Sequence, residues 1–443
     1  MLPFLFAVYF VYRGERTRAF LNVYLPCIIL MPAYYACRIP HFPLKFSGTT
    51  VLLPIGISLL LSPPRGFKFR RMDLWVALFA ISYAASAFRM ESDWVASMYE
   101  MVDTAFIEMF LAYVVGRMII EPDLRLETAK RIVLLMVLLA PFILFEYRFA
   151  QNPWLMIAQR MGLIGVGWFV QFRGGHARIA ATFGHAILAG VIFMCAISIN
   201  FYLREIYKRD KMRLGRWMSK LQSLRAPMLL FAVFLLMTRS RAPIGCAVLS
   251  LIVLQIPKFE DMKKASMIVL IVLAIGGVAV STYLDKYTDP GTAGMNEEQS
   301  SAIYRRQLLE DYKPILENGG WLGYGLFHHP KVIGLASIDN DYMLVQLSQG
   351  KLGLYLFILI AVESVWTTIT YAMKFRSRES LFLVFGLMGA LFGVFLSLTT
   401  VYLGEQMTQM LFLLLGWSQS LQDTGTDVEV MEQKFSFQRV FAS

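Results

Sequence analysis

The sequence predicts an all-α membrane protein that crosses the bilayer many times. Of its 443 residues, 57% are hydrophobic and only 16% are charged, whereas soluble domains have roughly 45–50% and about 25%. Apolar runs close to the length of a membrane-spanning helix, about 20 residues, recur along the whole chain. The basic residues gather in the connections between these runs. We therefore expect one transmembrane domain over residues 1–443.

Twelve or thirteen spanning helices are expected from the apolar runs. These runs lie near residues 20–37, 47–62, 73–88, 102–120, 131–149, 179–203, 221–238, 242–257, 265–284, 342–373, 380–402 and 405–421. Residues 1–12 are also apolar but short, so whether they span the membrane stays open. They carry no basic region in front and no small-residue cleavage site behind, which argues against a removable signal peptide.

The basic residues also predict the orientation. Together with the tail 422–443, six alternate connections hold 27 of the 42 lysines and arginines. Such residues are retained on the cytoplasmic side of a membrane. We therefore expect the tail in the cytoplasm and the long segment 285–340 in the periplasm or its equivalent. The net charge of +11 forms no single basic patch, which argues against nucleic acid as a partner.

Segment 285–340 is predicted to form a lid over the membrane helices. From about Ser301, apolar residues recur at a spacing that indicates an amphipathic helix. These residues are Ile303, Leu308, Leu309, Tyr312 and Leu316. Several glycines from Gly319 onward end the helix.

Arginines without neighbouring acids mark the predicted outer face. The connection from residue 148 to 178 contains Arg148, Arg160, Arg173 and Arg178, and it has no lysine and no acid. Guanidinium groups bind phosphate oxygens in a bidentate manner, so this connection is a candidate anion site. For Arg148 and Arg160, contact with lipid phosphates at the membrane surface is an equally good interpretation.

A sharper signal is the segment Thr238-Arg239-Ser240-Arg241, which interrupts an apolar run from 226 to 256. The flanking pieces predict an antiparallel helix pair with the two arginines at its outer tip. Pro243 suits the first turn of the second helix. A helix N-terminus beside guanidinium groups attracts phosphate. Arg239 and Arg241 are therefore candidate diphosphate ligands.

Few groups on the outer face could act as an acid or base. Asp339 and Asp341 precede an apolar run, where one of them could cap the helix and the other could serve as a general base. His328 and His329 are adjacent, so their side chains point apart, and we expect no metal site and no cofactor. The four cysteines, all expected to be buried and without disulfides, are Cys27, Cys37, Cys195 and Cys246.

Several motifs together resemble the O-antigen ligase and polymerase family of bacterial membrane glycosyltransferases. They are R-I-A-A-T-F-G-H from Arg178, T-R-S-R-A from Thr238, Y-R-R from Tyr304, G-Y-G from Gly323 and D-N-D-Y-M-L-V-Q-L-S-Q-G-K-L-G-L from Asp339. The resemblance covers roughly residues 175–365 and depends on the order and spacing of the motifs. A proline that follows the G-H pair in the family is replaced here by Ala186.

The resemblance implies a metal-independent, inverting glycosyltransferase of the bacterial inner membrane, with an active site that faces the periplasm. The fold would be similar to that of C-type glycosyltransferases, with a lid over a lipid-accessible cavity. Donor and acceptor would be glycans linked to undecaprenyl diphosphate, and a chain-length regulator protein is a candidate partner.

The resemblance also implies residue roles. Arg241 and Arg305 would hold the diphosphate, and Arg178 corresponds to the arginine that opens the earlier stretch. Arg239 fits the same role by its charge. As general base we expect Asp339 first. His185, His328 and His329 are the alternatives.

Asp339 also separates the alternatives within the family. Ligases have a histidine at this position and many polymerases have Asp-Asn, so the chain is predicted to polymerise lipid-linked repeat units. An O-antigen ligase that transfers glycan to lipid A core is the nearest alternative. A transporter of lipid-linked glycans or small solutes is the alternative from another class, for which Glu108 and Glu363 inside apolar runs would matter.

Overall fold

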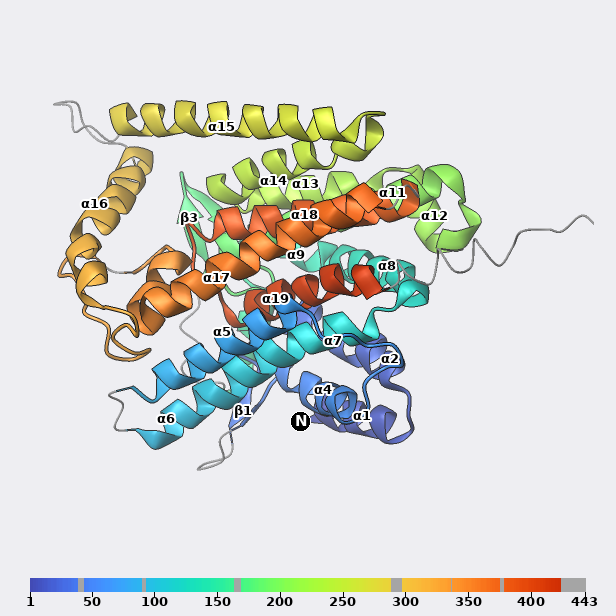
Figure 1. Ribbon diagram of the computed structural model, residues 1–443, viewed down its shortest axis with the longest axis horizontal. Coiled ribbons are helices and arrows are strands. Elements are labelled where there is room, and N and C mark those ends of the chain that lie inside the picture. The colour runs from blue at the N-terminus through green and yellow to red at the C-terminus, as the bar shows by residue number, and fades with distance from the viewer. Residues whose placement is uncertain are drawn as a thin grey trace, which may run out of the picture.

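The protein is a bundle of helices that run roughly side by side (Figure 1). The computed structural model describes residues 1–38, 44–89, 93–162, 169–287, 297–335, 337–374 and 378–423. Two short antiparallel hairpins provide the strands of these residues. Five helices of the described chain are long and apolar enough to cross a membrane, or six if the bent pair α12 and α13 counts as one span. The predicted all-α, multi-pass membrane architecture is confirmed.

The first half of the chain contains α1 (Leu2–Tyr12), α2 (Arg16–Ala19), the π-helix η1 (Phe20–Tyr24), α3 (Leu25–Leu30), β1 (Cys37–Arg38), β2 (Lys45–Phe46), the 3₁₀ helix η2 (Thr49–Val51), α4 (Leu52–Leu61), α5 (Arg71–Ala87), α6 (Trp94–Tyr99), the π-helix η3 (Glu100–Leu111), α7 (Ala112–Ile119), α8 (Pro122–Leu138), α9 (Ala140–Phe149), α10 (Pro153–Arg160), β3 (Gln171–Arg173) and β4 (His176–Arg178).

The second half contains α11 (Ala186–Arg209), the 3₁₀ helix η4 (Met212–Leu214), α12 (Arg216–Ser223), α13 (Ala226–Met237), α14 (Arg241–Val253), the 3₁₀ helix η5 (Ile256–Lys258), α15 (Met262–Tyr287), α16 (Glu297–Asn318), α17 (Asp341–Lys374), α18 (Arg378–Ser397), α19 (Glu405–Ser420) and the 3₁₀ helix η6 (Leu421–Asp423). The predicted tail 422–443 lies outside the described residues from 424 onward.

The apolar runs became helices, but fewer of them than expected are typical spans. α5 and α19 have 17 and 16 residues, and α1 has 11. The stretch 94–119 is one continuous helix built from α6, η3 and α7, but it carries several charged residues in its middle. The predicted count of twelve or thirteen is therefore not reached by helices that are both long and apolar.

Two predicted spans include residues that are not helical. Residues 31–37 leave the helix at Met31, whose backbone is extended (φ −116°, ψ 120°), and lead into β1. Residues 179–185 form a turn between β4 and α11, with Ala181 in the left-handed region (φ 51°). Cys37 is exposed on the β1 hairpin, so the prediction that all four cysteines are buried is wrong for this residue.

The helix α11 is the centre of the bundle. Its most apolar window is 94% buried, and it packs against α8, α13, α14 and α18. Gly190 on α11 permits the close approach of α14, because a Cβ at this position would lie 2.9 Å from Cβ of Pro243. At the other extreme, α15 lies at the edge of the bundle (Figure 1) and exposes large apolar side chains. Such a surface is suited to lipid.

α16 packs against the beginning of α17 and forms a second, smaller core. This core consists of Leu308 and Tyr312 from α16 with Met343 and Leu347 from α17. The predicted amphipathic face is thus confirmed for Leu308 and Tyr312, whereas Leu309 is 53% exposed. The helix begins at Glu297 rather than near Ser301.

The helix α17 is broken at Gly350, whose backbone has φ 72° and ψ −165°. The loop after α16 supplies the hydrogen bonds that the break removes. Four main-chain bonds connect the two segments: Tyr324 N to Leu347 O, Gly325 N to Ser348 O, Lys351 N to Gly320 O and Leu352 N to Trp321 O. The loop and the broken helix therefore form one hydrogen-bonded unit.

Candidate active site

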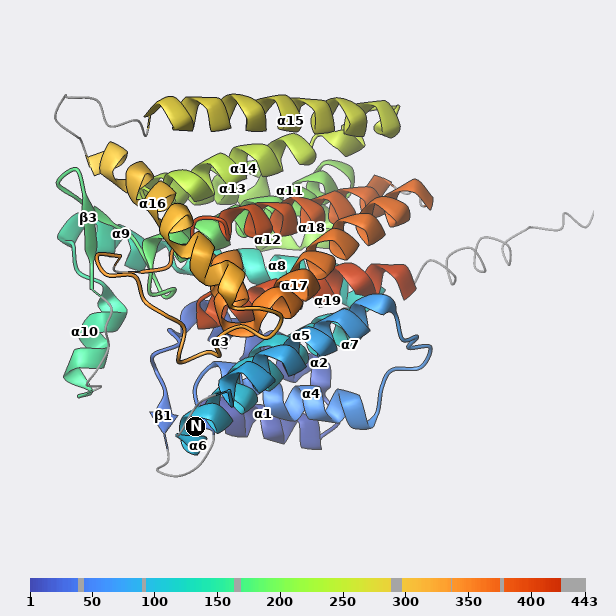
Figure 2. The same ribbon diagram turned by 60° about the vertical axis from the view of Figure 1, so that its left-hand side comes forward.

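Four arginines from three parts of the chain lie near Asp339 and His185 at one end of the bundle. These are Arg173, Arg178, Arg241 and Arg305, here called the arginine cluster. Burial and the charges of Arg173 and Arg305 lower the pKa of Arg178 to about 10. Arg305 in turn senses Asp339, Arg173 and Arg241. Figure 2 shows the elements that carry the cluster, β3, α14, α16 and the beginning of α17, meeting at this end.

Arg178 lies on β4 and is 8% exposed. Its Nε donates to the carbonyl oxygen of Thr238 (3.0 Å) and its Nη2 donates to Oγ of Ser240 (2.8 Å). Its Nη1 donates to Oε1 of Gln171 on β3 (3.1 Å). Because three of its nitrogen atoms bind protein oxygen, Arg178 fixes the turn that precedes α14 while its charge remains in the cluster.

A reciprocal pair of bonds connects the same turn to the hairpin. Nη1 of Arg173 donates to the carbonyl oxygen of Arg239 (2.9 Å), and Nη1 of Arg239 donates to the carbonyl oxygen of Arg173 (3.1 Å). Arg239 adopts a left-handed backbone (φ 50°), which is uncommon for residues other than glycine. The structure thus places Arg239 as a support of the turn rather than beside Arg305.

Arg241 is the first residue of α14 and is exposed. Its guanidinium therefore stands at the N-terminus of a helix, where the backbone N–H groups also favour an anion. The predicted tip of the helix pair is confirmed here, although α13 packs mainly on α11, and α14 packs mainly on α18 and α11, rather than on each other.

The helix α16 brings Arg305 to the cluster and turns its neighbour away. Arg306 is half exposed and forms an ion pair with Glu310 (2.9 Å). Burial, more than neighbouring charge, lowers the pKa of Arg305. Asp339 opposes this effect, whereas Arg173 and Arg241 add to it. A partly buried guanidinium between other cations and one carboxylate can therefore accept a further anion.

Three hydrogen bonds connect Asp339 to α16 through Ser337. The hydroxyl of Tyr304 donates to the carbonyl oxygen of Ser337 (2.6 Å), and the backbone N–H of Ser337 donates to the same hydroxyl (3.0 Å). Oγ of Ser337 then donates to Oδ1 of Asp339 (2.7 Å). Tyr304, which precedes Arg305, and Ser337, two residues before Asp339, thereby keep Arg305 and Asp339 together.

The role of helix cap falls to Asn340 and not to either aspartate. Oδ1 of Asn340 accepts from the backbone N–H of Met343 (3.2 Å). Asp341 is 3% exposed and its Oδ1 accepts from the backbone N–H of Leu403 (2.9 Å). Asp341 therefore supports the loop before α19, and Asp339 is left as the carboxylate of the cluster.

His185 caps α11 with its ring. Its Nδ1 accepts from the backbone N–H of Ile187 (3.2 Å), so in the neutral ring the proton lies on Nε2. Burial first, and then the charge of Arg178, lower the pKa of His185 to about 4, against the opposing effect of Asp339. At neutral pH His185 is thus a hydrogen-bond donor through Nε2 and is poorly suited as a base.

Glu146 was not identified from the sequence, yet it shapes the turn that carries His185. It is fully buried on α9. Its carboxylate accepts from the backbone N–H groups of Ala180 and Ala181 (3.0 and 2.9 Å) and from Nδ2 of Asn152 (2.9 Å). The one sequence signal for this role is the position of Glu146 inside an apolar run, because its backbone partners Ala180 and Ala181 are 34 and 35 residues away.

The segment that contains His328 and His329 is anchored to the end of α5 rather than to the arginine cluster. Both follow Gly325 in the sequence. Between Gly325 and the histidines, the backbone N–H of Leu326 donates to the carbonyl oxygen of Ser86 at the end of α5 (3.1 Å). Burial lowers the pKa of His329, and the charge that acts on it within the described chain is that of Lys331. Neither histidine is among the charges that act on Arg305.

A largely apolar cavity of about 250 Å³ lies beside the arginine cluster. Its wall includes Gly184 and Tyr402, which place it next to His185 and Asp339. The charge of Asp339 contributes to raising the pKa of Tyr402, after burial. The apolar part of its wall comprises Ala33, Phe183, Leu188, Ile192, Leu403 and Met407. The cluster thus combines cations with an adjoining apolar space.

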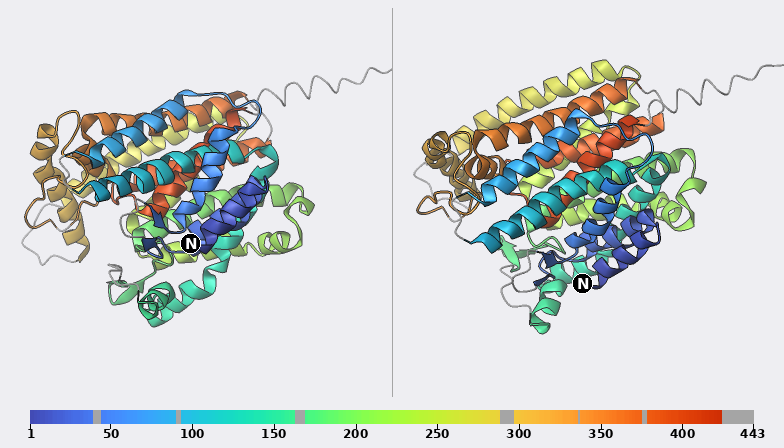
Figure 3. Two further views of the ribbon diagram at one scale, coloured as in Figure 1. Left: turned by 90° about the horizontal axis from the view of Figure 1, so that it is seen from below. Right: turned by 60° about the horizontal axis from the view of Figure 1, so that its bottom comes forward.

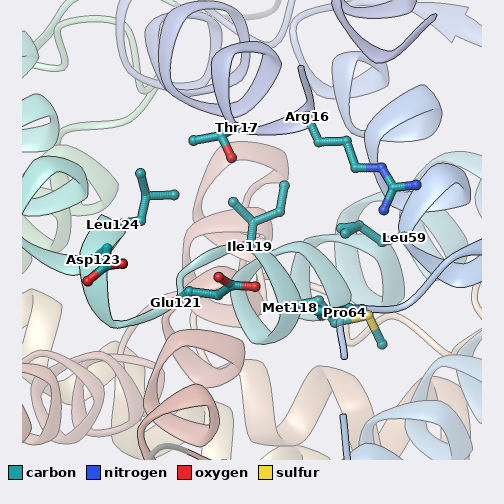
Figure 4. A pocket seen from close by; sticks show the side chains of 9 residues that line it. All are labelled: Arg16, Thr17, Leu59, Pro64, Met118, Ile119, Glu121, Asp123 and Leu124. Carbon is teal, nitrogen blue, oxygen red and sulfur yellow. The ribbon is translucent and has the colours of Figure 1, made fainter. Parts of the chain in front are cut away.

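A larger cavity, of about 350 Å³, lies at the opposite end of the bundle between α2, α4, α7 and α8 (Figure 4). Arg16 lines one side, and Glu121 and Asp123 line the other. Nη1 of Arg16 donates to the carbonyl oxygen of Ser62 (2.8 Å). None of the residues that line this cavity lines the cavity beside the arginine cluster, so the two are separate.

No protein-family model, curated protein or solved structure matches this chain. Among the described residues, no group of three or more His, Cys, Asp or Glu side chains is arranged to hold a metal ion. The geometry of the arginine cluster is therefore the main guide to function.

Proposed function

We propose that the protein is a bacterial inner-membrane polymerase of polysaccharide repeat units carried on undecaprenyl diphosphate. The observation that carries the proposal is the gathering of Arg173, Arg178, Arg241 and Arg305 around one carboxylate, Asp339. Four guanidinium groups around a single carboxylate fit a dianionic diphosphate. The adjoining apolar cavity fits the first part of a lipid chain.

The arginines would act on the leaving group. In the reaction, a hydroxyl oxygen of the acceptor sugar bonds to the anomeric carbon of the donor while that carbon loses its bond to the diphosphate oxygen. Negative charge then develops on the departing lipid diphosphate. Preorganised cations at this place lower the barrier by about 3–4 kcal/mol per donor in comparable sites. Arg241, at the N-terminus of α14, and Arg305, beside Asp339, are the best placed.

Asp339 would accept the proton of the attacking hydroxyl. Its carboxylate is partly exposed and lies beside Arg305. The Nδ1 atom of His185, by contrast, already accepts from the backbone N–H of Ile187, so the ring carries its proton on Nε2. A single displacement of this kind inverts the anomeric configuration and requires no covalent nucleophile. The aspartate, in place of the histidine of ligases, favours a polymerase over a ligase.

The proposal includes the membrane arrangement. The end of the bundle with the arginine cluster would face the periplasm, covered by α16 as a lid, and twelve or thirteen segments would cross the membrane in a C-type-like arrangement. A chain-length regulator is the protein partner to look for.

A reconstituted assay tests this function. Purified protein in liposomes receives the lipid-linked repeat unit of its own strain, and the products are separated by length. A ladder of lipid-linked polymers is expected without added divalent metal and also with EDTA. Transfer to lipid A core without a ladder would establish a ligase instead. Solute or lipid flux without either product would establish a transporter.

A further inference from the structure

A third cavity, of about 210 Å³ and with a polar wall, lies between α5, η3 and the beginning of α19. Here called the polar cavity, it is lined by Tyr83, Tyr99, Glu100, Asp103, Thr104 and Leu403, among others. Leu403 also lines the apolar cavity beside the arginine cluster. The two cavities are therefore neighbours across the loop that begins at Val401.

The wall contains a hydrogen-bond network of hydroxyl groups around one carboxylate. Oε2 of Glu100 accepts from the hydroxyl of Tyr83 (2.9 Å) and from Oγ1 of Thr104 (2.9 Å). A carboxylate accepts hydrogen bonds only, and each hydroxyl group can both donate and accept. Tyrosine adds an apolar ring face to its polar end. Groups of this kind recognise a ligand that has many hydroxyl groups on an apolar ring.

The backbone of η3 directs several polar side chains to the same place. It is a π-helix of 12 residues, and such helices are rare and occur frequently at functional sites. Its wider turn keeps residues four and five apart on one face. Asp103 and Glu108 are 4% and 1% exposed, and both line the cavity with Lys45. Lys45, Asp103 and Glu108 each interact with other groups of the protein, so the polar wall is already ordered without a ligand.

The charge of the wall decides which part of a substrate it accepts. Three carboxylates and one lysine line the polar cavity, which repels a diphosphate. The arginine cluster has the opposite charge and attracts one. A reaction that joins two lipid-linked glycans needs both kinds of site, because the donor presents its diphosphate and the acceptor presents a sugar hydroxyl.

We propose that the polar cavity binds the acceptor sugar, the ring whose hydroxyl group attacks the donor. The sugar would lie against Tyr83 and Glu100 and present its reacting hydroxyl across the loop of Tyr402 and Leu403 toward Asp339. Tyr402 is close enough to Asp339 to sense its charge, so the carboxylate lies near this loop. This inference rests on the proposed function, but sugar binding is measurable without catalysis.

The binding experiment uses purified full-length protein and the repeat-unit oligosaccharide of its own strain, released from its lipid. Binding is measured by titration calorimetry for the wild type and for the Glu100→Gln, Thr104→Val and Arg241→Ala variants. We expect Glu100→Gln to weaken binding about tenfold, the loss for one hydrogen bond to a charged group. Arg241→Ala should bind like the wild type. Tyr83→Phe is measured in the same way, and Tyr12→Phe, at a tyrosine that is 89% exposed, is its matched control.

The kinetic experiment separates the two substrates. With a long labelled donor and a short acceptor supplied separately, Glu100→Gln and Tyr83→Phe should raise the acceptor KM about tenfold and leave the donor KM unchanged. Thr104→Val provides a second variant if Glu100→Gln does not reach the membrane.

Several outcomes would decide against the inference. Wild-type binding and elongation in all three cavity variants, with an inactive Arg241→Ala, would overturn it and leave the proposed polymerase intact. Solute or proton flux that depends on Glu100 without any change in polymer length would make the cavity a transport site. Sugar binding that depends on Glu100 in a wild type that forms no polymer would support the cavity and overturn the polymerase.

Discussion

Two adjacent arginines on α16 differ in their surroundings and hence in their expected importance. Arg305 is partly buried beside Asp339, whereas Arg306 is paired with Glu310 on the surface. We expect Arg305→Ala and Arg241→Ala to abolish polymer formation, because each removes a cation from the proposed diphosphate site, while the amount of protein in the membrane stays near normal. Arg306→Ala is the matched control. Product ladders and membrane immunoblots make the comparison. Long polymer in either cluster variant would rule out the diphosphate site.

Asp339 is the expected proton acceptor, and Asp339→Asn removes its basicity with almost no change in size. The asparagine can still accept the hydrogen bond from Ser337, so the local structure should persist. Activity in the reconstituted assay should fall by a factor of about 100 or more, the range for general base catalysis. A variant with wild-type turnover would reduce Asp339 to an orienting group.

His185 predicts a dependence of stability on pH. Its folded pKa of about 4 lies below the value of about 6.5 in an unfolded chain. Between these values the unfolded state binds more protons, so the free energy of unfolding decreases as the pH falls from about 6.5 to 4. Thermal unfolding in detergent at several pH values should show this decrease in the wild type and less of it in His185→Asn. Parallel curves for the two proteins would contradict the assignment.

Sequence patterns predicted which residues lie at the site better than they predicted the role of each residue. Arg178, Arg241, Arg305, Asp339 and His185 were all expected, and the structure brings them together. Local sequence could not distinguish an arginine that binds an anion from one that supports a turn. That distinction depends on long-range partners, such as the carbonyl oxygen of Thr238 for Arg178.

Among the helices, the break in α17 offers a direct test of the lid. A Cβ at Gly350 would approach the backbone N of Gly323 to 2.3 Å and the carbonyl oxygen of Trp321 to 2.4 Å. Gly350→Ala should therefore displace the loop after α16, lower the unfolding temperature and reduce activity. Gly276→Ala on α15 is the control, because nothing lies within 4 Å of the added atom. Equal unfolding temperatures for the two variants would show that the loop adapts freely.

Helices were predictable where apolar length alone determines them, and were missed where distant contacts do. Residues 179–185 were expected to be helical, but Glu146 binds the backbone N–H groups of Ala180 and Ala181 and holds a turn there. The run 342–373 was read as one helix because Gly350 resembles any glycine within a helix. The π-helix η3 has no sequence pattern that separates it from an α-helix.

For the molecule as a whole, exposed and buried thiols provide a test of orientation. β1, with the exposed Cys37, lies on the same side of the bundle as α10 and β3 (Figure 2), whereas Cys27, Cys195 and Cys246 are buried. If the end of the bundle with the arginine cluster faces the periplasm, a membrane-impermeant maleimide should label Cys37 in spheroplasts. The Cys37→Ser substitution should abolish the signal.

A cysteine at the other end provides the control for this labelling. Met212 is 88% exposed and follows α11, which begins at the arginine cluster and extends for 24 residues, about 36 Å. Met212→Cys in a Cys37→Ser background should react only after lysis. Labelling of Cys37 after lysis alone would reverse the orientation.

The arrangement of the helices around α11 could not be read from the sequence. Hydropathy gives the positions of apolar segments but not their neighbours. The span formed by α8 and α9 has nearly the same mean hydropathy as α11 but is 39% buried, against 94% for α11. Figure 3 shows the first helices, α1 to α4, gathered on one side of the bundle. That placement depends on long-range contacts, such as that of Tyr24 with Gln409.

The hydrogen bonds between the loop after α16 and the broken part of α17 also limit how the proposed lid can change. Leu347 and Ser348 have carbonyl oxygens that accept from Tyr324 and Gly325 rather than from the next turn of their own helix. A shortened chain without the loop would leave these oxygens without donors in a region that water does not reach easily. A related protein with a different loop at this place would therefore also need a different first part of α17. The two segments would have to change together in evolution.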